Sequence, residues 1–301
     1  MRIAAIDLGT NTFHLIIAEQ ENDELKIIYK TNAPVRLGEG RLNDNLIIDA
    51  AFKRGVDQLK IYSETLKEYK VTRFKTTGTS AIRSASNGKD FVNTVKAETG
   101  IDIEVISGDE EAALIFEGVK ASGAISDTSL IVDIGGGSTE FIICNNEGLL
   151  WKKSYNVGAA RLMQRFFNSD PLSKADEALI LNHLQDTLED LNQVYTKYKP
   201  TTLVGSAGAF ETFAGMLYPE LNTKEIKSAL IDFNAYRKLA DTFLTSTHAQ
   251  REKMEGLIPL RVDMIVMAAL LTNYVLDFTG ITNIKLSTYD LKMGVLASLN
   301  Q

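Results

Sequence analysis

Two short segments each place an aspartate directly before a run of small residues. They read Asp7-Leu8-Gly9-Thr10-Asn11-Thr12 and Asp133-Ile134-Gly135-Gly136-Gly137-Ser138-Thr139. Small residues permit positive φ and let backbone N–H groups approach an oxyanion closely, while the Thr and Ser hydroxyls add donors. We therefore expect both turns to bind phosphate, and Asp7 and Asp133 to hold a hard cation such as Mg²⁺ directly or through water. The alternative is a pair of tight glycine turns with no ligand.

Two glutamates could act on a phosphate held by these turns. Glu111 ends the acidic run Asp109-Glu110-Glu111, which follows a predicted strand. The first two acids are explained as caps or dipole partners at a helix start. Glu111 lacks that explanation, and a carboxylate there could take a proton from a water that attacks phosphorus. Glu140, directly after the second turn, could orient the same water or a metal ion.

Three arginines are candidate phosphate ligands. Arg83 is the best of them, because it follows a Gly/Thr/Ser turn and opens a predicted helix. A planar guanidinium can bind two phosphate oxygens at once. Arg36 and Arg161 lie at nearly repeat-related positions (161 − 36 = 125). For any one of the three, a solvated surface position is the more common outcome.

An internal repeat indicates which elements position these residues. Residues 5–17 align with 131–143 at a constant offset (133 − 7 = 126), and each copy is typical of a β-hairpin. Two strand–turn–helix pairs follow in the same order: residues 74–83 with 202–209, and 103–112 with 284–292. The extra residues of the second copy fall in a helix-rich stretch at about 211–280, which we interpret as an insertion.

The repeat predicts an α/β protein with two similar domains and a ligand in the cleft between them. We expect the first domain at residues 1–122 and the second at 123–301, with a final helix at 289–301 that joins the first domain. Amphipathic patterns at 173–198 and 225–245 predict helices whose apolar stripes belong to the core.

Composition narrows the classes of partner. The chain has 301 residues and a formal net charge of −7. An acidic protein does not gain the general driving force for binding nucleic acid that comes from release of its counterions. Its single cysteine suits a reducing compartment. The N-terminus lacks the apolar region of a signal peptide, and the longest apolar stretch, residues 264–271, is too short to span a bilayer. We expect a cytoplasmic protein that binds neither nucleic acid nor membrane.

Four ordered motifs resemble the exopolyphosphatase and guanosine pentaphosphate phosphatase family. They are AAIDLGTNTFHLIIA, TGTSAIRSASN, VISGDEEAALIFEGV and IVDIGGGSTEFII. The resemblance implies duplicated ribonuclease H-like domains of the actin, sugar kinase and Hsp70 superfamily. It also implies Mg²⁺-dependent removal of a terminal phosphate from inorganic polyphosphate or pppGpp, and a homodimer.

The resemblance also assigns roles to individual residues. It implies Glu111 as the catalytic glutamate, Arg83 as a phosphate-binding arginine, and a third glycine loop from Gly205 to Gly208. Phosphate-loop and metal acids match Asp7, Asp133 and Glu140. The chain departs from the family pattern where Ala113 replaces an arginine, where the third loop reads GSAGAF, and where Lys292-Met293 replaces Arg-Glu.

Two other functions are compatible with these motifs. A non-catalytic module that binds polyphosphate or an alarmone fits the drifted motifs of the second half. A small-molecule kinase of the same fold is disfavoured, because residues 205–210 and 264–271 make a poor purine site. Retained ligand binding without Mg²⁺-dependent turnover would favour the binding module.

Overall fold

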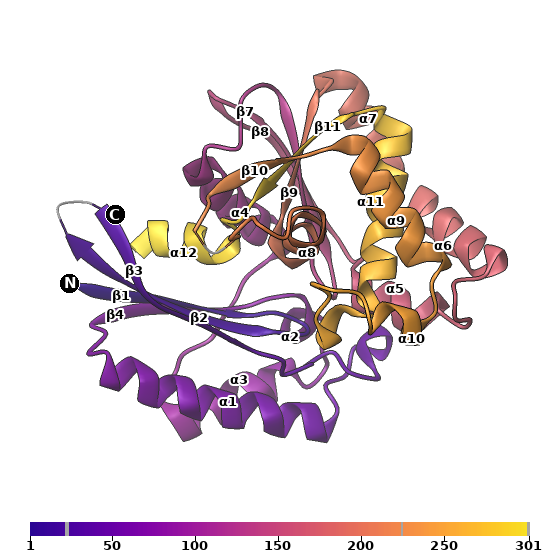
Figure 1. The fold of residues 1–301 in the computed structure, drawn as a ribbon. Coiled ribbons are helices and arrows are strands. Elements are labelled where there is room, and N and C mark those ends of the chain that lie inside the picture. The colour runs from indigo at the N-terminus through magenta and orange to yellow at the C-terminus, as the bar shows by residue number, and fades with distance from the viewer. Residues whose placement is uncertain (22–23, 224, 300–301) are drawn as a thin grey trace. The chain divides into compact units, whose positions relative to one another are not determined.

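A computed structural model describes residues 1–21, 24–223 and 225–299. The chain divides into two compact units, each built on its own mixed sheet (Figure 1). The first unit comprises Met1–Gly118 and the segment from Leu291 onward, and the second comprises Val119–Asp290. The domain boundaries that the repeat predicts, 1–122 and 123–301, remain predictions.

The sheet of the first unit has five strands in the order β3-β2-β1-β4-β5. Its strands are β1 (Arg2–Leu8), β2 (Phe13–Glu21), β3 (Glu24–Ala33), β4 (Arg73–Gly78) and β5 (Glu104–Val105). The hairpin predicted around Asp7 is confirmed: β1 and β2 are antiparallel, and β4 runs parallel to β1. Strand β1 is apolar and almost wholly buried, which places Asp7 near the end of a rigid element.

Helices cover both faces of this sheet. Figure 1 shows α1 and α3 side by side on one face, whereas α12 packs on the other against β1 and β4. Gly55 of α1 lets the ring of Phe91 in α3 approach, since a Cβ there would lie 2.8 Å from that ring. The helices of this unit are α1 (Asp49–Glu68), α2 (Ser80–Ser84), α3 (Gly88–Thr99), α4 (Gly108–Ser122), whose last turn lies in the second unit, and α12 (Leu291–Leu299), with a 3₁₀ turn at Leu42–Asp44.

The sheet of the second unit repeats the same plan with one strand added. Its order is β10-β11-β9-β6-β7-β8, so β8-β7-β6-β9-β11 reproduces β3-β2-β1-β4-β5 and β10 extends the edge. The strands are β6 (Ser129–Ile134), β7 (Thr139–Asn145), β8 (Gly148–Tyr155), β9 (Thr202–Ser206), β10 (Ser228–Ile231) and β11 (Asn283–Ser287). The shared order confirms the duplicated α/β plan.

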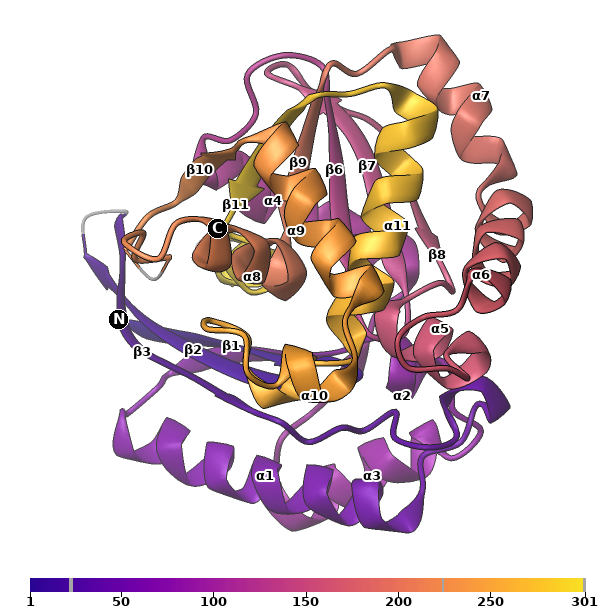
Figure 2. The same ribbon diagram turned by 45° about the vertical axis from the view of Figure 1, so that its right-hand side comes forward.

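The core of the second unit lies between its sheet and a layer of helices. Figure 2 shows α9 and α11 as neighbouring helices in front of the sheet. Helix α11 is buried along nearly its whole length, which explains the apolar stretch at 264–271 as core. The helices are α5 (Ala159–Phe166), α6 (Lys174–Thr187), α7 (Glu189–Tyr198), α8 (Ala207–Leu217), α9 (Phe233–Thr245), α10 (His248–Arg251) and α11 (Met264–Thr279), with a 3₁₀ turn at Pro259–Arg261. None of the described helices combines the length and apolar character that a membrane crossing needs.

The structure refines two predictions of secondary structure and confirms a third. The pattern at 173–198 is two helices, α6 and α7, that meet at Leu188. The prediction of one amphipathic helix from 225 to 245 is wrong at its start, because residues 228–231 pair with β11 as strand β10. The final helix is confirmed over Leu291–Leu299, and residues 300 and 301 lie outside the described residues.

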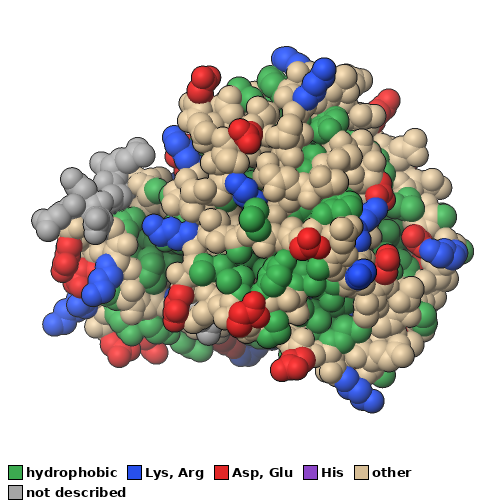
Figure 3. Space-filling view, turned by 45° about the horizontal axis from the view of Figure 1, so that its top comes forward, with side chains coloured by type: hydrophobic (Ala, Val, Ile, Leu, Met, Phe, Trp, Pro, Cys, Tyr) green, Lys and Arg blue, Asp and Glu red, His purple; other side chains and the backbone are tan. Residues whose placement is uncertain are grey.

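Charged side chains of both signs are interspersed on the face that Figure 3 shows, with hydrophobic and neutral groups between them. That face carries no broad patch of a single sign. On this face a polyanion would therefore need local donors rather than a general basic surface, which agrees with the net charge of −7.

Candidate functional site

The first glycine turn connects β1 to β2 and is held by a second segment. The Gly9 N–H donates to Thr12 O at 3.2 Å, and a Cβ on Gly9 would lie 2.9 Å from that oxygen. The N–H groups of Arg36 and Gly38 donate to Asn11 O and Thr10 O at 2.8 and 2.9 Å. Two loop carbonyls are thus fixed by the segment that follows β3.

Arg83, which is partly buried, and Glu111, which is buried, form an ion pair in the first unit. Arg83 Nη1 donates to Glu111 Oε2 at 2.8 Å and to Ile106 O at 3.0 Å. Arg83 comes from α2, directly after β4, and Glu111 from the first turn of α4, directly after β5. Because β4 and β5 are parallel neighbours, their following segments meet at the same edge of the sheet. The structure therefore brings together the predicted base and the predicted phosphate-binding arginine.

The environment of Glu111 sets its proton affinity. Burial raises the pKa of this carboxyl above its ordinary value, whereas the charge of Arg83 and its hydrogen bond oppose that rise. Only 7% of Glu111 is exposed, so burial acts on nearly the whole side chain. A carboxylate whose pKa is raised in this way is a better base than an exposed one.

The acid next to Glu111 has a different role. Ser107 N–H donates to Glu110 Oε2 at 2.7 Å, and Glu110 N–H donates to Ser107 Oγ at 3.2 Å. This reciprocal pair is a capping box at the start of α4. The prediction that Glu110 is explained as a cap is confirmed, and Glu111 differs from it in burial and partner.

The strand ends beside the ion pair of Arg83 and Glu111 contain one residue that the sequence analysis did not identify. Thr79 Oγ1 donates to Leu8 O at 3.1 Å, which ties β4 to β1. The Ser80 hydroxyl, next in the chain, is buried and has no hydrogen-bond partner among the described residues. Ser80 is therefore a candidate ligand donor at the start of α2. Its position in the TGTSAIR motif was the only signal available in the sequence.

Two carboxylates lie opposite each other on paired strands of the second unit. Asp133 of β6 and Glu140 of β7 are register partners, and both are buried. Ser206 Oγ donates to Asp133 Oδ2 at 2.8 Å, and Ser154 Oγ donates to Glu140 Oε1 at 2.6 Å. Directly opposed residues of an antiparallel pair project on the same face. The arrangement places two acids together, each oriented by a serine hydroxyl.

The second glycine turn lies between these strands and contacts α5. Ala159 N–H donates to Gly135 O at 2.9 Å, and Ala160 and Arg161 N–H donate to Gly136 O at 2.9 and 3.0 Å. Arg161 Nε also donates to Gly137 O at 3.0 Å. Arg161, a candidate phosphate ligand by sequence, thus contacts the loop backbone.

The side chains predicted to add donors to this turn differ in their partners. Ser138 is buried within the turn. The Thr139 hydroxyl donates to Val157 O. Because a hydroxyl has one proton, Thr139 does not donate to an anion in this conformation.

The predicted third loop contains glycines with two different surroundings. Gly205 lies inside β9, where the ring of Phe210 occupies the space that a Cβ would need, at 2.0 Å. Its lack of a side chain serves packing, and its predicted contact with phosphate stays a prediction. Gly208 lies in the first turn of α8, where a Cβ would be 2.0 Å from Arg261 Nη2.

Arg261 is a second residue that the sequence analysis missed. Its guanidinium lies against Gly208 and donates to the Thr212 hydroxyl. Burial lowers the pKa of this arginine, which Glu211 partly offsets. No sequence signal indicated it, because Arg261 is more than 50 residues from the loop (261 − 208 = 53) in a segment with no counterpart in the first half.

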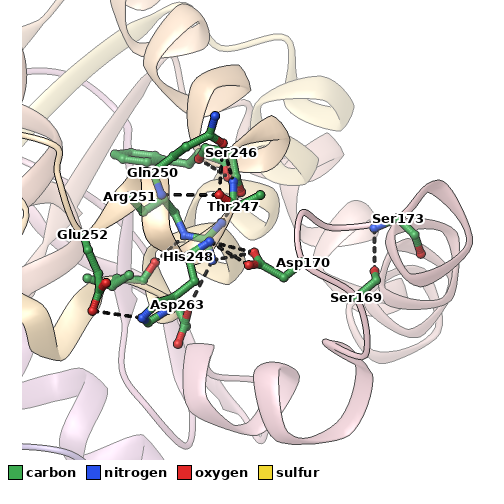
Figure 4. A network of polar contacts seen from close by, with 12 residues as sticks. Ser169, Asp170, Ser173, Ser246, Thr247, His248, Gln250, Arg251, Glu252 and Asp263 are labelled. Carbon is green, nitrogen blue, oxygen red and sulfur yellow. Dashed lines mark hydrogen bonds and ion pairs between the residues drawn. The ribbon is translucent and has the colours of Figure 1, made fainter.

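A polar network anchors the segment that carries Arg261. Figure 4 shows the guanidinium of the buried Arg251 directed toward Asp170 and Asp263, with Nη2–Oδ1 distances of 3.2 and 3.0 Å. His248 Nδ1 lies 2.7 Å from Asp263 Oδ1, and its Nε2 lies 3.1 Å from Glu252 Oε1. The hydrogen bond and charge of Asp263 raise the pKa of His248.

The described residues contain no group of three or more His, Cys, Asp or Glu side chains that could hold a metal ion. The pair formed by Asp133 and Glu140 nevertheless fits Mg²⁺, which proteins usually bind through one or two carboxylates together with waters and substrate phosphate. Asp7 belongs to the other unit, and its predicted share in a metal site stays a prediction.

Comparison with known proteins identifies the class. The Ppx/GppA phosphatase family matches residues 16–301, so this chain belongs to that family. It is 37% identical to an exopolyphosphatase from Cytophaga hutchinsonii whose crystal structure superimposes with a TM-score of 0.97 and covers 100% of this chain and 98% of that one. A family member from Aquifex aeolicus is 26% identical, with a TM-score of 0.83 and coverage of 99% and 97%. The predicted family is confirmed, and these structures also confirm the predicted α/β fold.

Some relatives are longer. A guanosine-5'-triphosphate,3'-diphosphate pyrophosphatase from Aeromonas salmonicida is 27% identical over 296 residues, which span 98% of this chain and 59% of that protein. The chain therefore covers little more than half the length of this relative.

Proposed function

We propose that this chain hydrolyses the terminal phosphoanhydride bond of inorganic polyphosphate or of pppGpp, in a Mg²⁺-dependent reaction for which Glu111 is the general base. The contact between the buried Glu111 and the partly buried Arg83 carries the proposal, because it places an acid with a raised pKa beside a cation at the edge of a sheet that also bears a glycine turn. The names of the Cytophaga and Aeromonas relatives supply the two substrate classes.

The chemistry assigns each group one task. A water oxygen attacks the terminal phosphorus, the bond to the bridging oxygen breaks, and the shortened chain leaves with the electron pair of that bond. The proton of the water passes to Glu111 Oε1, since Oε2 is the oxygen that Arg83 contacts. Arg83 holds the carboxylate in one orientation and keeps its pKa from rising further.

The glycine turns supply preorganised donors for charge on the phosphate. Backbone N–H groups fixed before the reaction stabilise developing negative charge without reorganising. Asp133 and Glu140 are the residues that would hold Mg²⁺, which when bound neutralises charge on the phosphate oxygens.

The test is phosphate release by the intact protein from tripolyphosphate, long-chain polyphosphate and pppGpp, with Mg²⁺ or with EDTA. The wild type should release phosphate only with Mg²⁺. Glu111→Gln should lose on the order of 10²–10⁴-fold in kcat. The matched control is Glu110→Gln, which alters the neighbouring acid and keeps the capping box, because glutamine also serves there.

Each alternative outcome is informative. Absence of release from all three substrates would refute the hydrolase, and tight tripolyphosphate binding in that case would favour the binding module. Equal loss in both glutamine variants would assign the effect to the start of α4 rather than to a base at Glu111.

A further inference from the structure

The N-terminus of α5 donates hydrogen bonds to another segment of the chain. The first N–H groups of a helix lack partners within the helix and are common anion sites. In α5, three of them, from Ala159, Ala160 and Arg161, donate to carbonyls of Gly135 and Gly136. This helix therefore binds the glycine turn itself rather than a ligand.

The hydrogen bonds from α5 determine the direction in which the N–H groups of the turn at 135–138 point. Gly135 O and Gly136 O accept from the α5 backbone, and Gly137 O accepts from Arg161 Nε. In a planar trans peptide the C=O of one residue and the N–H of the next point in opposite directions. The N–H groups of Gly136, Gly137 and Ser138 consequently point away from α5 as three successive donors, an arrangement that suits an anion.

Close approach of α5 depends on Gly158. A Cβ at this position would lie 2.6 Å from the carbonyl carbon and oxygen of Gly136 and 2.7 Å from Gly137 N. These neighbours are backbone atoms of the turn, so no side chain can rotate to make room. Any larger residue must displace the turn or the start of α5.

We infer that Gly158 and Arg161 are positioning residues, which fix the turn at 135–138 so that its N–H groups converge on a phosphate. Gly158 admits α5 to the turn, and Arg161 Nε fastens its third carbonyl. The inference rests on the proposed function for the identity of the anion. The fixed geometry of the turn does not depend on it.

Gly158→Ala tests the close approach, with Gly215→Ala as its control. A Cβ on Gly215, in α8 of the same unit, meets no atom within 4 Å. Without substrate, backbone hydrogen exchange of Gly135, Ala159 and Ala160, whose N–H groups donate to oxygens of the turn, should be about tenfold faster in Gly158→Ala, as loss of one of these bonds implies. With tripolyphosphate, kcat should fall on the order of 10²-fold with a smaller change in KM, as for a displaced transition-state donor.

A variant series at residue 161 separates positioning from charge and does not depend on whether Gly158→Ala folds. Glutamine places Nε2 at the same distance along the side chain as arginine Nε, whereas methionine has a carbon there and lysine keeps only the charge. Positioning through Gly137 O predicts slower exchange of the Gly135, Ala159 and Ala160 amides and a higher kcat for Arg161→Gln than for Arg161→Met. Arg161→Lys should then perform no better than Arg161→Gln.

Two results would overturn the inference. One is unchanged exchange of the Gly135, Ala159 and Ala160 amides in folded Gly158→Ala and in Arg161→Met. The other is a series in which Arg161→Lys retains kcat and Arg161→Gln does not, which would make charge the function of Arg161. An inactive wild type would refute the proposed hydrolase, and the exchange measurements would still decide the positioning role.

Discussion

The two units place different chemistry on the same sheet plan. Across the first hairpin Asp7 faces His14, whereas at the repeat-related positions Asp133 faces Glu140 (140 − 14 = 126). Among the described residues, the ion pair of Arg83 and Glu111 has no counterpart in the second copy of the repeat, where Lys292 aligns with Glu111. In the proposed function, the duplication thus retained a glycine turn in both units, and the proposed base and the proposed cation ligands lie in different units.

The turns themselves are held to different degrees. In the first unit a non-helical segment fixes the carbonyls of Thr10 and Asn11. In the second, a helix and one arginine fix three successive carbonyls. A helix N-terminus supplies several parallel donors, so one element can orient a whole turn. We infer that the second turn is the more rigid of the two.

The largest difference that we expect between the two units is in the Mg²⁺ dependence of phosphate release. Glu140→Gln removes one of two opposed carboxylates. It should raise the Mg²⁺ concentration needed for half-maximal phosphate release by at least about tenfold. His14→Gln, at the equivalent position of the first unit, should change that concentration by less than about threefold. Titration of phosphate release with Mg²⁺ measures both variants. Equal effects at the two positions would remove the proposed division between units.

The next effect concerns two glycines at repeat-related strand ends (205 − 78 = 127). A Cβ on Gly205 would lie 2.0 Å from the Phe210 ring, whereas one on Gly78 would lie 3.0 Å from a methyl group of Ile103. Gly205→Ala should therefore cost about 1–3 kcal/mol or more of unfolding free energy, as overpacking does. Gly78→Ala should cost less. Chemical denaturation compares them, and a larger loss in Gly78→Ala would contradict the packing argument.

Much of this site was predictable because its signals are local. A glycine turn needs particular residues at adjacent positions, so both hairpins and the cap at Glu110 could be predicted directly. The pairing of Arg83 with Glu111 could not, since it depends on β4 and β5 being neighbours in a sheet. The packing role of Gly205 and the position of Arg261 also required tertiary structure. Strand β10 escaped prediction because four residues at a sheet edge leave little periodic signal.

The smallest effect concerns the His248 network of the second unit. The pKa of His248 is raised in the folded state, chiefly by its hydrogen bond to Asp263. The folded state therefore binds the proton more tightly than the unfolded chain, whose His pKa is about 6.5. The resulting stabilisation is complete below that pH and is lost as the pH rises through the folded pKa.

His248→Gln should accordingly lower Tm at pH 5.5 and change it little at pH 9. Thermal unfolding of the two proteins at both pH values measures the difference. The same Tm difference at both pH values would show that protonation of His248 contributes nothing.

The central claim, that the pair of Arg83 and Glu111 supplies the base, is tested most directly by the pH dependence of kcat for phosphate release from tripolyphosphate. A base must be ionised to accept a proton, so kcat should rise with pH through the raised pKa of Glu111. Arg83→Met removes the charge and the hydrogen bond that lower this pKa, so the acidic limb should move to higher pH. Arg73→Met, an exposed arginine at the start of β4, should leave the limb in place. An acidic limb at the same pH in wild type and Arg83→Met would contradict the account.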